Sequence, residues 1–242
     1  MQRYFVSSIN NNGNIILSKD DIFHILKVLR MKVGDKFEIN DDGIIYLAEI
    51  SILDPFKFSI IKTIDENREL LVNVTLLYCY PKKEHLEIAL QKATELGVNK
   101  IVLVNSNYVD IRITNDNINK KFIRFNKIIK EAGEQSKRTV LPTIYDKVID
   151  YREINKFKSD LNLIAYENST SSTKLLKNYL ENSRYKDISI LVGPEGGFTK
   201  SEVSYALEND FKEISLGKTI LRSETSVIYL LSVINYECGA KI

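Results

Sequence analysis

The sequence predicts a two-part α/β protein. A small β-barrel in residues 1–70 precedes a mostly parallel sheet with flanking helices in residues 71–242. Short apolar runs separated by turn residues fill the first part, and strands alternate with helical periodicities from residue 72 onward. The 242 residues suffice to bury a core in two modest domains or in one large one.

In the first part, strands are expected at residues 4–6, 14–17, 36–40, 44–50 and 57–64, and one short helix at 20–28. Asp42 and Gly43 stand between two of these strands, and an Asp-Gly pair in that place predicts a hairpin. Nine lysines and arginines stand against eleven aspartates and glutamates in residues 1–70, so the predicted barrel is not basic overall.

The polar residues 65–70 predict a linker to the second part. Strands are expected there at residues 72–80, 101–104, 161–165, 188–192 and 213–216, and helices at 83–96, 117–136, 175–180 and 224–238. Thr199 and Glu202 have the spacing of a capping box that opens one more helix. Such alternation predicts a parallel sheet covered on both faces.

Composition excludes several classes of protein. Lysine and arginine number 34 against 32 acidic residues, a net charge of +2, which excludes nucleic-acid binding by bulk charge alone but not a local basic face. Two cysteines and two histidines (His24 and His85) exclude a disulfide scaffold, argue against a structural zinc site and leave no Ser-His-Asp set. With no signal-peptide pattern and no apolar run of about eighteen residues, we expect a cytoplasmic protein.

Three loops follow strands of the predicted parallel sheet, at residues 166–169, 193–198 and 217–223, where ligands of open parallel sheets bind. The middle one reads Gly193, Pro194, Glu195, Gly196, Gly197, Phe198 and holds three of the ten glycines. Its spacing is neither the dinucleotide fingerprint nor a P-loop. Loop physics alone leaves a ligand site and a tight strand-to-helix turn equally open.

Two clusters of charge carry weaker signals. Arg222 and Glu224 begin the last predicted helix, where a glutamate suits the dipole and an arginine does not, so either an anionic partner or a surface salt bridge is indicated. Between Lys120 and Arg138 stand seven basic residues and two glutamates, which suits either phosphate contacts or the dipole of a helix end. The cations around residues 24–36 are typical of solvated surface.

Together, these segments resemble the RsmE family of bacterial 16S ribosomal RNA (uracil-N3)-methyltransferases, of the SPOUT class. The resemblance is carried, in order, by residues 24–30 with 34–35, 91–98, 134–138 with Pro142, 193–198 with Glu202, and 216–217 with 220–225. This sequence departs from the family pattern at Gly133, at Ser226 and at residues 81–83.

The resemblance implies methylation of N3 of a uridine in small-subunit ribosomal RNA, within the assembled 30S subunit, with S-adenosyl-L-methionine as cofactor. It implies a SPOUT-type trefoil-knotted catalytic domain, a PUA-like RNA-binding barrel before it, and a homodimer, without a metal or a membrane. The implied cofactor-binding residues are Tyr166, Glu167, Val192, Gly193, Pro194, Glu195, Gly196, Gly197, Leu216, Gly217, Ile220, Leu221 and Thr225.

Methyl transfer to N3 requires that a proton leave the uridine. We assign Arg222 to the developing negative charge or the target phosphate, and Glu224 to the orientation of Arg222 or, as a weaker alternative, to the role of base. The assigned RNA-binding residues are Arg3, His24, Arg30, Lys92, Gln135 and Arg138.

Two rival functions stay open. One is a knotted methyltransferase that acts on tRNA or on a ribose hydroxyl. The other is a non-catalytic RNA-binding or ribosome-assembly factor on the same fold, which would not bind S-adenosylmethionine.

Overall fold

The chain divides into two compact units. The computed structural model describes residues 1–6, 15–109, 115–166, 174–181 and 185–239. One unit comprises Met1–Arg68 and Gly133–Val140, and the other comprises Glu69–Ala132 and Leu141–Ile242. The first unit therefore includes a short segment from the middle of the chain.

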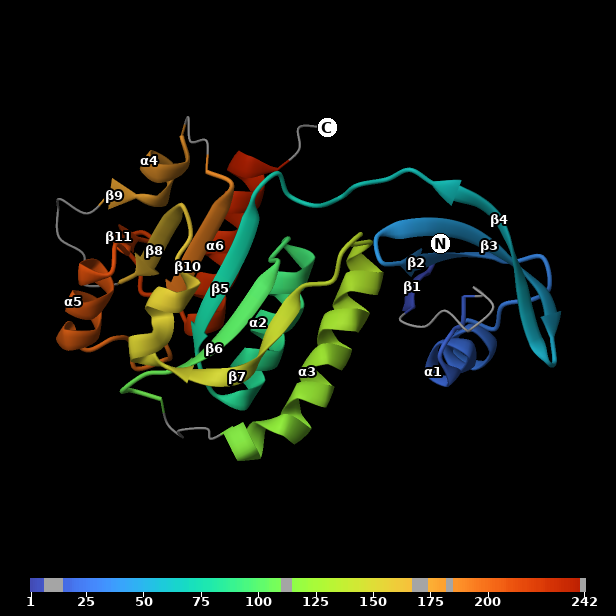
Figure 1. Ribbon diagram of the computed structural model, residues 1–242, viewed down its shortest axis with the longest axis horizontal. Helices are drawn as coiled ribbons and strands as arrows, with labels where there is room; N and C mark the ends of the chain where they lie inside the picture. Colours follow the sequence, from blue (N-terminus) through green and yellow to red (C-terminus); the bar gives the residue numbers. More distant parts are fainter. Residues whose placement is uncertain (7–14, 110–114, 167–173, 182–184, 240–242) are drawn as a thin grey trace. The chain divides into compact units, whose positions relative to one another are not determined.

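A four-stranded sheet forms the first unit, in the order β1-β2-β3-β4 (Figure 1). Its strands are β1 (Arg3–Val6), β2 (Lys36–Asp41), β3 (Ile44–Leu53) and β4 (Phe56–Ile64). β1 is parallel to β2, and the other two pairs are antiparallel. Asp42 and Gly43 have φ values of 46° and 89°, as the predicted two-residue hairpin requires.

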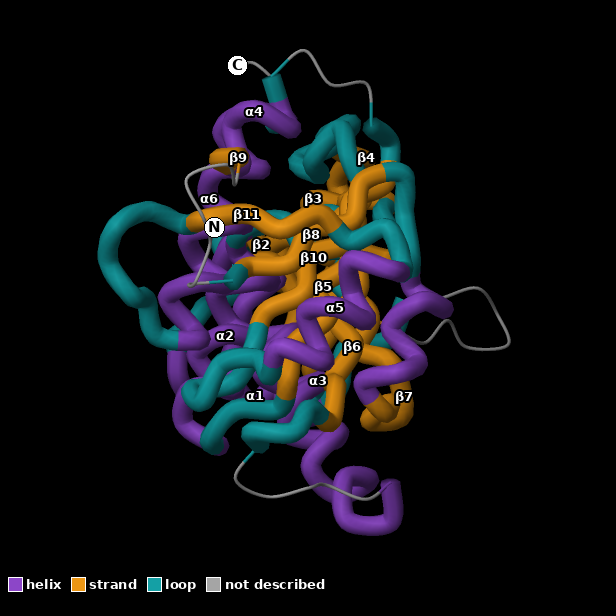
Figure 2. The backbone as a smooth tube through the Cα atoms, turned by 90° about the vertical axis from the view of Figure 1, so that its left-hand side faces the viewer, coloured by secondary structure: helices purple, strands orange, loops and turns teal. Residues whose placement is uncertain are grey.

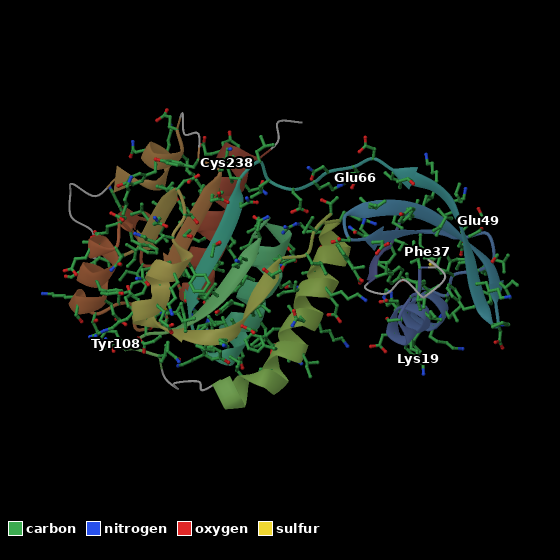
Figure 3. All side chains as sticks on the ribbon, in the orientation of Figure 1. Lys19, Phe37, Glu49, Glu66, Tyr108 and Cys238 are labelled. Atoms are coloured by element: carbon green, nitrogen blue, oxygen red, sulfur yellow. The ribbon has the colours of Figure 1, made fainter. Side chains whose placement is uncertain are left out.

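A capping box begins the short helix α1 (Lys19–Phe23), which continues as a π-helical turn over His24–Val28. Ser18 and Asp21 cap each other's backbone groups. The predicted strand at residues 14–17 is wrong, because Ile15 makes only an isolated bridge before the chain turns into the Ser18 cap; Asn14 lies outside the described residues. The helical segment and the sheet enclose a core that includes Ile25, Ile39 and Phe37. Phe37 is labelled in Figure 3.

Arg3 joins the segment Gly133–Val140 to this sheet. Its guanidinium is fully buried and donates to the backbone oxygens of Lys137 (2.8 Å) and Arg138 (3.1 Å). It also pairs with Glu38 at 2.9 Å and with Glu66 at 3.0 Å. These contacts give each of the three guanidinium nitrogens of Arg3 a partner within the protein, as a buried arginine requires.

Seven parallel strands form the sheet of the second unit, in the order β7-β6-β5-β10-β8-β11-β9. They are β5 (Asn73–Cys79), β6 (Lys100–Asn105), β7 (Thr143–Asp150), β8 (Leu161–Ala165), β9 (Lys174–Leu175), β10 (Asp187–Val192) and β11 (Lys212–Ser215). The predicted α/β class with a mostly parallel sheet is confirmed.

Two strands were not anticipated, and both lie at sheet edges. β7 is mostly exposed along its length, so Thr143–Asp150 has no continuous apolar run of the kind that marks a buried strand. β9 is only two residues long. Edge strands bury one side at most, which weakens the sequence signal.

Helices cover both faces of this sheet. One face carries α2 (Lys83–Glu95), α3 (Asn115–Ser136), α4 (Leu176–Leu180) and α6 (Ser223–Cys238), and the other carries α5 (Lys200–Glu208) and a 3₁₀ helix (Tyr151–Phe157). Figure 2 shows α2 and α6 on the same side of the strands. The described helices include none that is both long and apolar enough to cross a membrane.

Candidate active site

Three loops at the carboxyl edge of the parallel sheet meet around one pocket. They follow β8, β10 and β11 and enclose about 210 Å³, beside a second pocket of about 80 Å³ that shares part of its wall. Ten of the predicted cofactor-binding residues line the two pockets: Tyr166, Val192, Gly193, Pro194, Glu195, Gly197, Leu216, Gly217, Ile220 and Leu221. Open parallel sheets bind ligands at this edge.

The other three predicted cofactor-binding residues, Glu167, Gly196 and Thr225, are not among the residues that line the two pockets. Glu167 lies outside the described residues. Among the residues that the structure places, Gly196 and Thr225 do not line either pocket. A Cβ added at Gly196 would lie 2.8 Å from the Cβ of Tyr108, a half-exposed residue beyond the end of β6 (Figure 3). Gly196 therefore lets the loop approach its neighbour closely, rather than forming the pocket wall.

The glycine-rich loop is folded by its own backbone. Gly197 has a φ of 70° and its N–H donates to the Pro194 carbonyl at 2.9 Å, closing a tight turn. Thr199 and Glu202 then form the predicted capping box of α5. The Glu202 carboxylate also accepts from the Asn107 N–H at 2.8 Å, which ties this loop to the one after β6.

Ser223 fixes the start of α6 against the glycine-rich loop. Its hydroxyl donates to the Gly193 carbonyl at 2.6 Å and lies 3.1 Å from the Tyr78 hydroxyl, with all of these groups buried. Burial raises the pKa of Tyr78 far above its ordinary value. Tyr78 therefore stays protonated at neutral pH and can act only as a hydrogen-bonding group.

We expect Ser223→Ala to lower the free energy of unfolding by about 1–3 kcal/mol, because it leaves the Gly193 carbonyl and the Tyr78 hydroxyl without this partner. Denaturant midpoints would measure the loss. Ser226→Ala is the matched control and should cost less, since among the described residues the Ser226 hydroxyl bonds only to the Arg222 carbonyl at the start of its own helix. Equal midpoints for both variants would contradict the assignment.

Arg222 stands at the N-terminus of α6 and lines the larger pocket. Its side chain is exposed, and within the described part of the chain its guanidinium makes no hydrogen bond or ion pair. A cation in this place opposes the positive end of the helix dipole. The guanidinium is thus available to an anionic ligand.

Glu224 is buried two residues further along, and its carboxylate lies 2.6 Å from His85 Nδ1 on α2. Burial alone would raise its pKa, but the hydrogen bonds from His85 and from its own N–H, with the charges of His85 and Arg222, hold the pKa of Glu224 below its usual value. Such a carboxylate is ionised at neutral pH and is a weak base. Its side-chain hydrogen bond goes to His85, and not to Arg222 as its predicted orienting role would require.

Two of the predicted RNA-binding residues are not accessible. Arg3 is fully buried in its contacts with Glu38, Glu66 and the carbonyls of the 133–140 segment, so its assignment to RNA is corrected to a structural role. Arg138 is also buried, at 3% exposure, and is corrected likewise. A buried guanidinium cannot reach a phosphate without breaking the packing around it.

The other four predicted RNA-binding residues keep some exposure. Arg30 and Gln135 are exposed. His24 is half-buried, with Nδ1 2.9 Å from the Tyr4 hydroxyl. Lys92 donates to Glu95 at 2.9 Å along α2. These side chains remain candidates for RNA contacts.

His85, Tyr78 and Ser223 have positions in the site that were not predicted from the sequence. A serine at the start of a helix is a common local signal, so Ser223 could have been singled out. No local signal in the sequence marks His85 or Tyr78, because their hydrogen-bonding partners lie 139 and 145 residues away in the chain. Among the described residues, no cluster of three or more histidine, cysteine or acidic side chains is placed to hold a metal ion.

Two family models match the chain. An RNA methyltransferase domain matches residues 68–235, and an RNA methyltransferase PUA domain matches residues 17–62. Ribosomal RNA small subunit methyltransferase E of Bacillus subtilis is 32% identical, over 98% of this chain and 97% of that protein. The protein of the same name from Rickettsia conorii is 34% identical, over 93% of this chain and 91% of that one.

A solved structure agrees with these matches. The crystal structure of a ribosomal RNA small subunit methyltransferase E from Neisseria gonorrhoeae, bound to S-adenosyl methionine, superposes with a TM-score of 0.85 at 28% identity, over 99% of this chain and 98% of that one. The resemblance drawn from the sequence motifs is thereby confirmed. The chain belongs to the ribosomal RNA small subunit methyltransferase E family of RNA methyltransferases.

Proposed function

We propose that this protein methylates small-subunit ribosomal RNA at N3 of a uridine, with S-adenosylmethionine as the methyl donor. The observation that carries the proposal is the pocket at the carboxyl edge of the sheet, where the loops after β8, β10 and β11 meet. The names of the relatives support the RNA class, and the ligand of the Neisseria gonorrhoeae structure supports the cofactor.

The residues of the pocket fit an adenosyl group. Val192, Ile220 and Leu221 supply apolar walls, and the glycine-rich loop lines the pocket beside them through Gly193, Pro194, Glu195 and Gly197. Pockets for such ligands are mostly apolar, with a few placed polar groups. When bound there, S-adenosylmethionine would supply a methyl group activated by its sulfonium.

The chain's part in the chemistry is to position the uridine and to stabilise its charge. As the N3 proton leaves to solvent water, negative charge develops on the base. A donor aimed at such charge is the largest single contribution in many enzymes. Arg222 has the free guanidinium for this task, whereas Tyr78 is held protonated and Glu224 is a weak base.

The remaining parts of the proposal concern assembly. The first unit binds RNA as a PUA-like barrel, the chain works as a cytoplasmic homodimer on the 30S subunit, and its catalytic domain, from residue 71, follows a trefoil-knotted path. The PUA-domain match supports the barrel.

We expect Ile220→Ala to weaken S-adenosylmethionine binding about tenfold, because burial of such an apolar side chain contributes about 1.5–3 kcal/mol. Ile220 is 81% exposed and lines both pockets, so the change should leave folding intact. Calorimetric titration would measure the affinity. Ile123→Ala is the matched control, since Ile123 is 77% exposed on α3 and lines neither described pocket.

Mapping of methylated nucleotides tests the proposed function itself. Small-subunit particles and naked ribosomal RNA are each incubated with wild-type protein and labelled S-adenosylmethionine, and the product is digested and sequenced by mass spectrometry. One N3-methyluridine in small-subunit RNA is expected. Methylation of tRNA or of a ribose hydroxyl, or cofactor binding without any transfer, would overturn it.

A further inference from the structure

Tyr108 is a half-exposed aromatic residue beside the candidate active site. It follows β6 at the carboxyl edge of the parallel sheet, and 52% of its surface is exposed (Figure 3). Glu195 and Gly197 line the larger pocket, and Gly196 between them lies close to Tyr108. Tyr108 therefore lies against the backbone of the loop that walls the pocket.

The contact with Tyr108 accounts for the glycine at position 196. A Cβ there would lie 2.8 Å from the Tyr108 Cβ and 3.4 Å from the Tyr108 carbonyl oxygen. The φ of Gly196 is not in the left-handed region, unlike that of Gly197, so its backbone conformation does not by itself require glycine. Gly196 and Tyr108 are both exposed, so this close approach is made at the surface and not in the core.

The residues on either side of Tyr108 are anchored. The Asn107 N–H donates to the buried Glu202 carboxylate at 2.8 Å, and the Asn107 amide donates to Thr199 Oγ1 at 3.4 Å. Val109 packs against the larger core of the second unit. Tyr108 thus extends from a backbone that is held on both sides, and such pre-organisation lowers the entropy cost when a partner binds.

The chemistry of the proposed reaction points to the partner. N3 of a uridine lies on its Watson–Crick edge, so a base that is methylated there must first be unpaired and taken out of its stack. Exposed aromatic side chains are the groups on which such unstacked RNA bases rest. Tyr108 lies beside the pocket wall and can supply this surface to a nucleotide that adjoins the target.

We propose that Tyr108 stacks on a base of the RNA substrate next to the target uridine and so holds the unpaired RNA at the pocket. The inference rests on the proposed function and adds an RNA-contacting residue to it. Gly196 serves this contact, because its missing Cβ lets Tyr108 approach the loop. In a purely structural role the ring would only cover the loop, and any apolar side chain of similar size would suffice.

Three substitutions separate stacking from packing. Tyr108→Phe keeps the ring without the hydroxyl, Tyr108→Leu keeps apolar bulk without a flat ring, and Tyr108→Ala removes both. We expect kcat/KM for small-subunit ribosomal RNA to fall about tenfold in Tyr108→Leu and Tyr108→Ala, which lose base stacking, and to stay within about twofold of wild type in Tyr108→Phe. The S-adenosylmethionine Kd should stay within about twofold of wild type in all three.

Fluorescence reports the contact directly. The chain contains no tryptophan, so Tyr108→Trp carries the only one. Naked small-subunit ribosomal RNA should quench its emission, because a stacked base lies against the indole. Tyr236→Trp is the matched control: Tyr236 is 85% exposed but lies about 20 Å along α6 from Ser223, at the other end of the helix. Its emission should change little.

Each outcome decides the inference. A wild-type kcat/KM in Tyr108→Leu overturns it, as does a loss in Tyr108→Phe equal to that in Tyr108→Ala, or equal quenching in Tyr108→Trp and Tyr236→Trp. Weakened cofactor binding in Tyr108→Leu and Tyr108→Ala assigns the residue to loop structure alone, and the proposed function then stands without it. A wild-type protein that binds cofactor but methylates no uridine overturns the proposed function, and the quenching then decides the RNA contact by itself.

Discussion

Replacement of Arg222 by alanine is expected to lower kcat for methyl transfer by about 10²–10³-fold, the range seen when one charge-stabilising donor is removed from an active site. Arg222 lines the pocket and is exposed, and its guanidinium has no partner among the described residues. Neither Tyr78 nor Glu224 can take over its charge. The chemistry therefore depends on this side chain more than on any other in the pocket.

Single-turnover rates with saturating cofactor would measure this effect, and calorimetry would show whether S-adenosylmethionine still binds. The Kd is expected to change by about threefold at most, because the cofactor's apolar walls stay in place. Arg152→Ala is the matched control: Arg152 is also exposed, but lies on the 3₁₀ helix of the opposite face. A kcat within threefold of wild type for Arg222→Ala would show that the role is wrong.

Replacement of Arg3 by methionine is expected to destabilise the first unit by about 3–5 kcal/mol, the cost of removing one partner from a buried ionic network. Methionine fills much of the volume but removes a donor from the carbonyls of Lys137 and Arg138. It also leaves Glu38 with Lys137 alone, and Glu66 with Arg68 alone, as cation partners among the described residues. Burial makes the loss large, since water cannot replace the guanidinium there.

Hydrogen-exchange mass spectrometry of peptides that contain β1 and β2 would report this loss in the first unit alone. Arg68→Met is the matched control, because Arg68 pairs with the same Glu66 but its side chain is 54% exposed. Such a surface pair contributes about 1 kcal/mol or less. Similar protection in Arg3→Met and wild type would refute the structural role of Arg3.

Much of the second unit could be predicted from sequence, because its central strands are buried on both faces and appear as continuous apolar runs. The glycine-rich loop was also found locally, through three glycines whose positions the turn and close packing require. Strand β7 was not predicted, because an edge strand has no such continuous apolar run. The polar contacts of the site were not predicted either, for a different reason.

Hydrogen bonds between distant residues leave no local pattern. Nothing in the local sequence distinguishes Arg3 from a surface arginine, because the carbonyls that it donates to lie 134 and 135 residues away in the chain. The same holds for His85, whose partner is Glu224. Residue type and spacing located the loops of the site, while the charges that act within it depend on contacts that only the fold reveals.

The insertion of Gly133–Val140 into the first unit has a consequence for the order of events during synthesis. The last strand of that sheet ends at Ile64, but the side chain of Asn40 donates to the carbonyl of Thr139. Thr139 is synthesised about 75 residues after Ile64, so this hydrogen bond cannot form until then. At about 5–20 residues per second, a nascent barrel stays incomplete for about 4–15 seconds. Its maturation on the ribosome is thereby coupled to emergence of the catalytic half, and the barrel cannot be released as a finished module ahead of it.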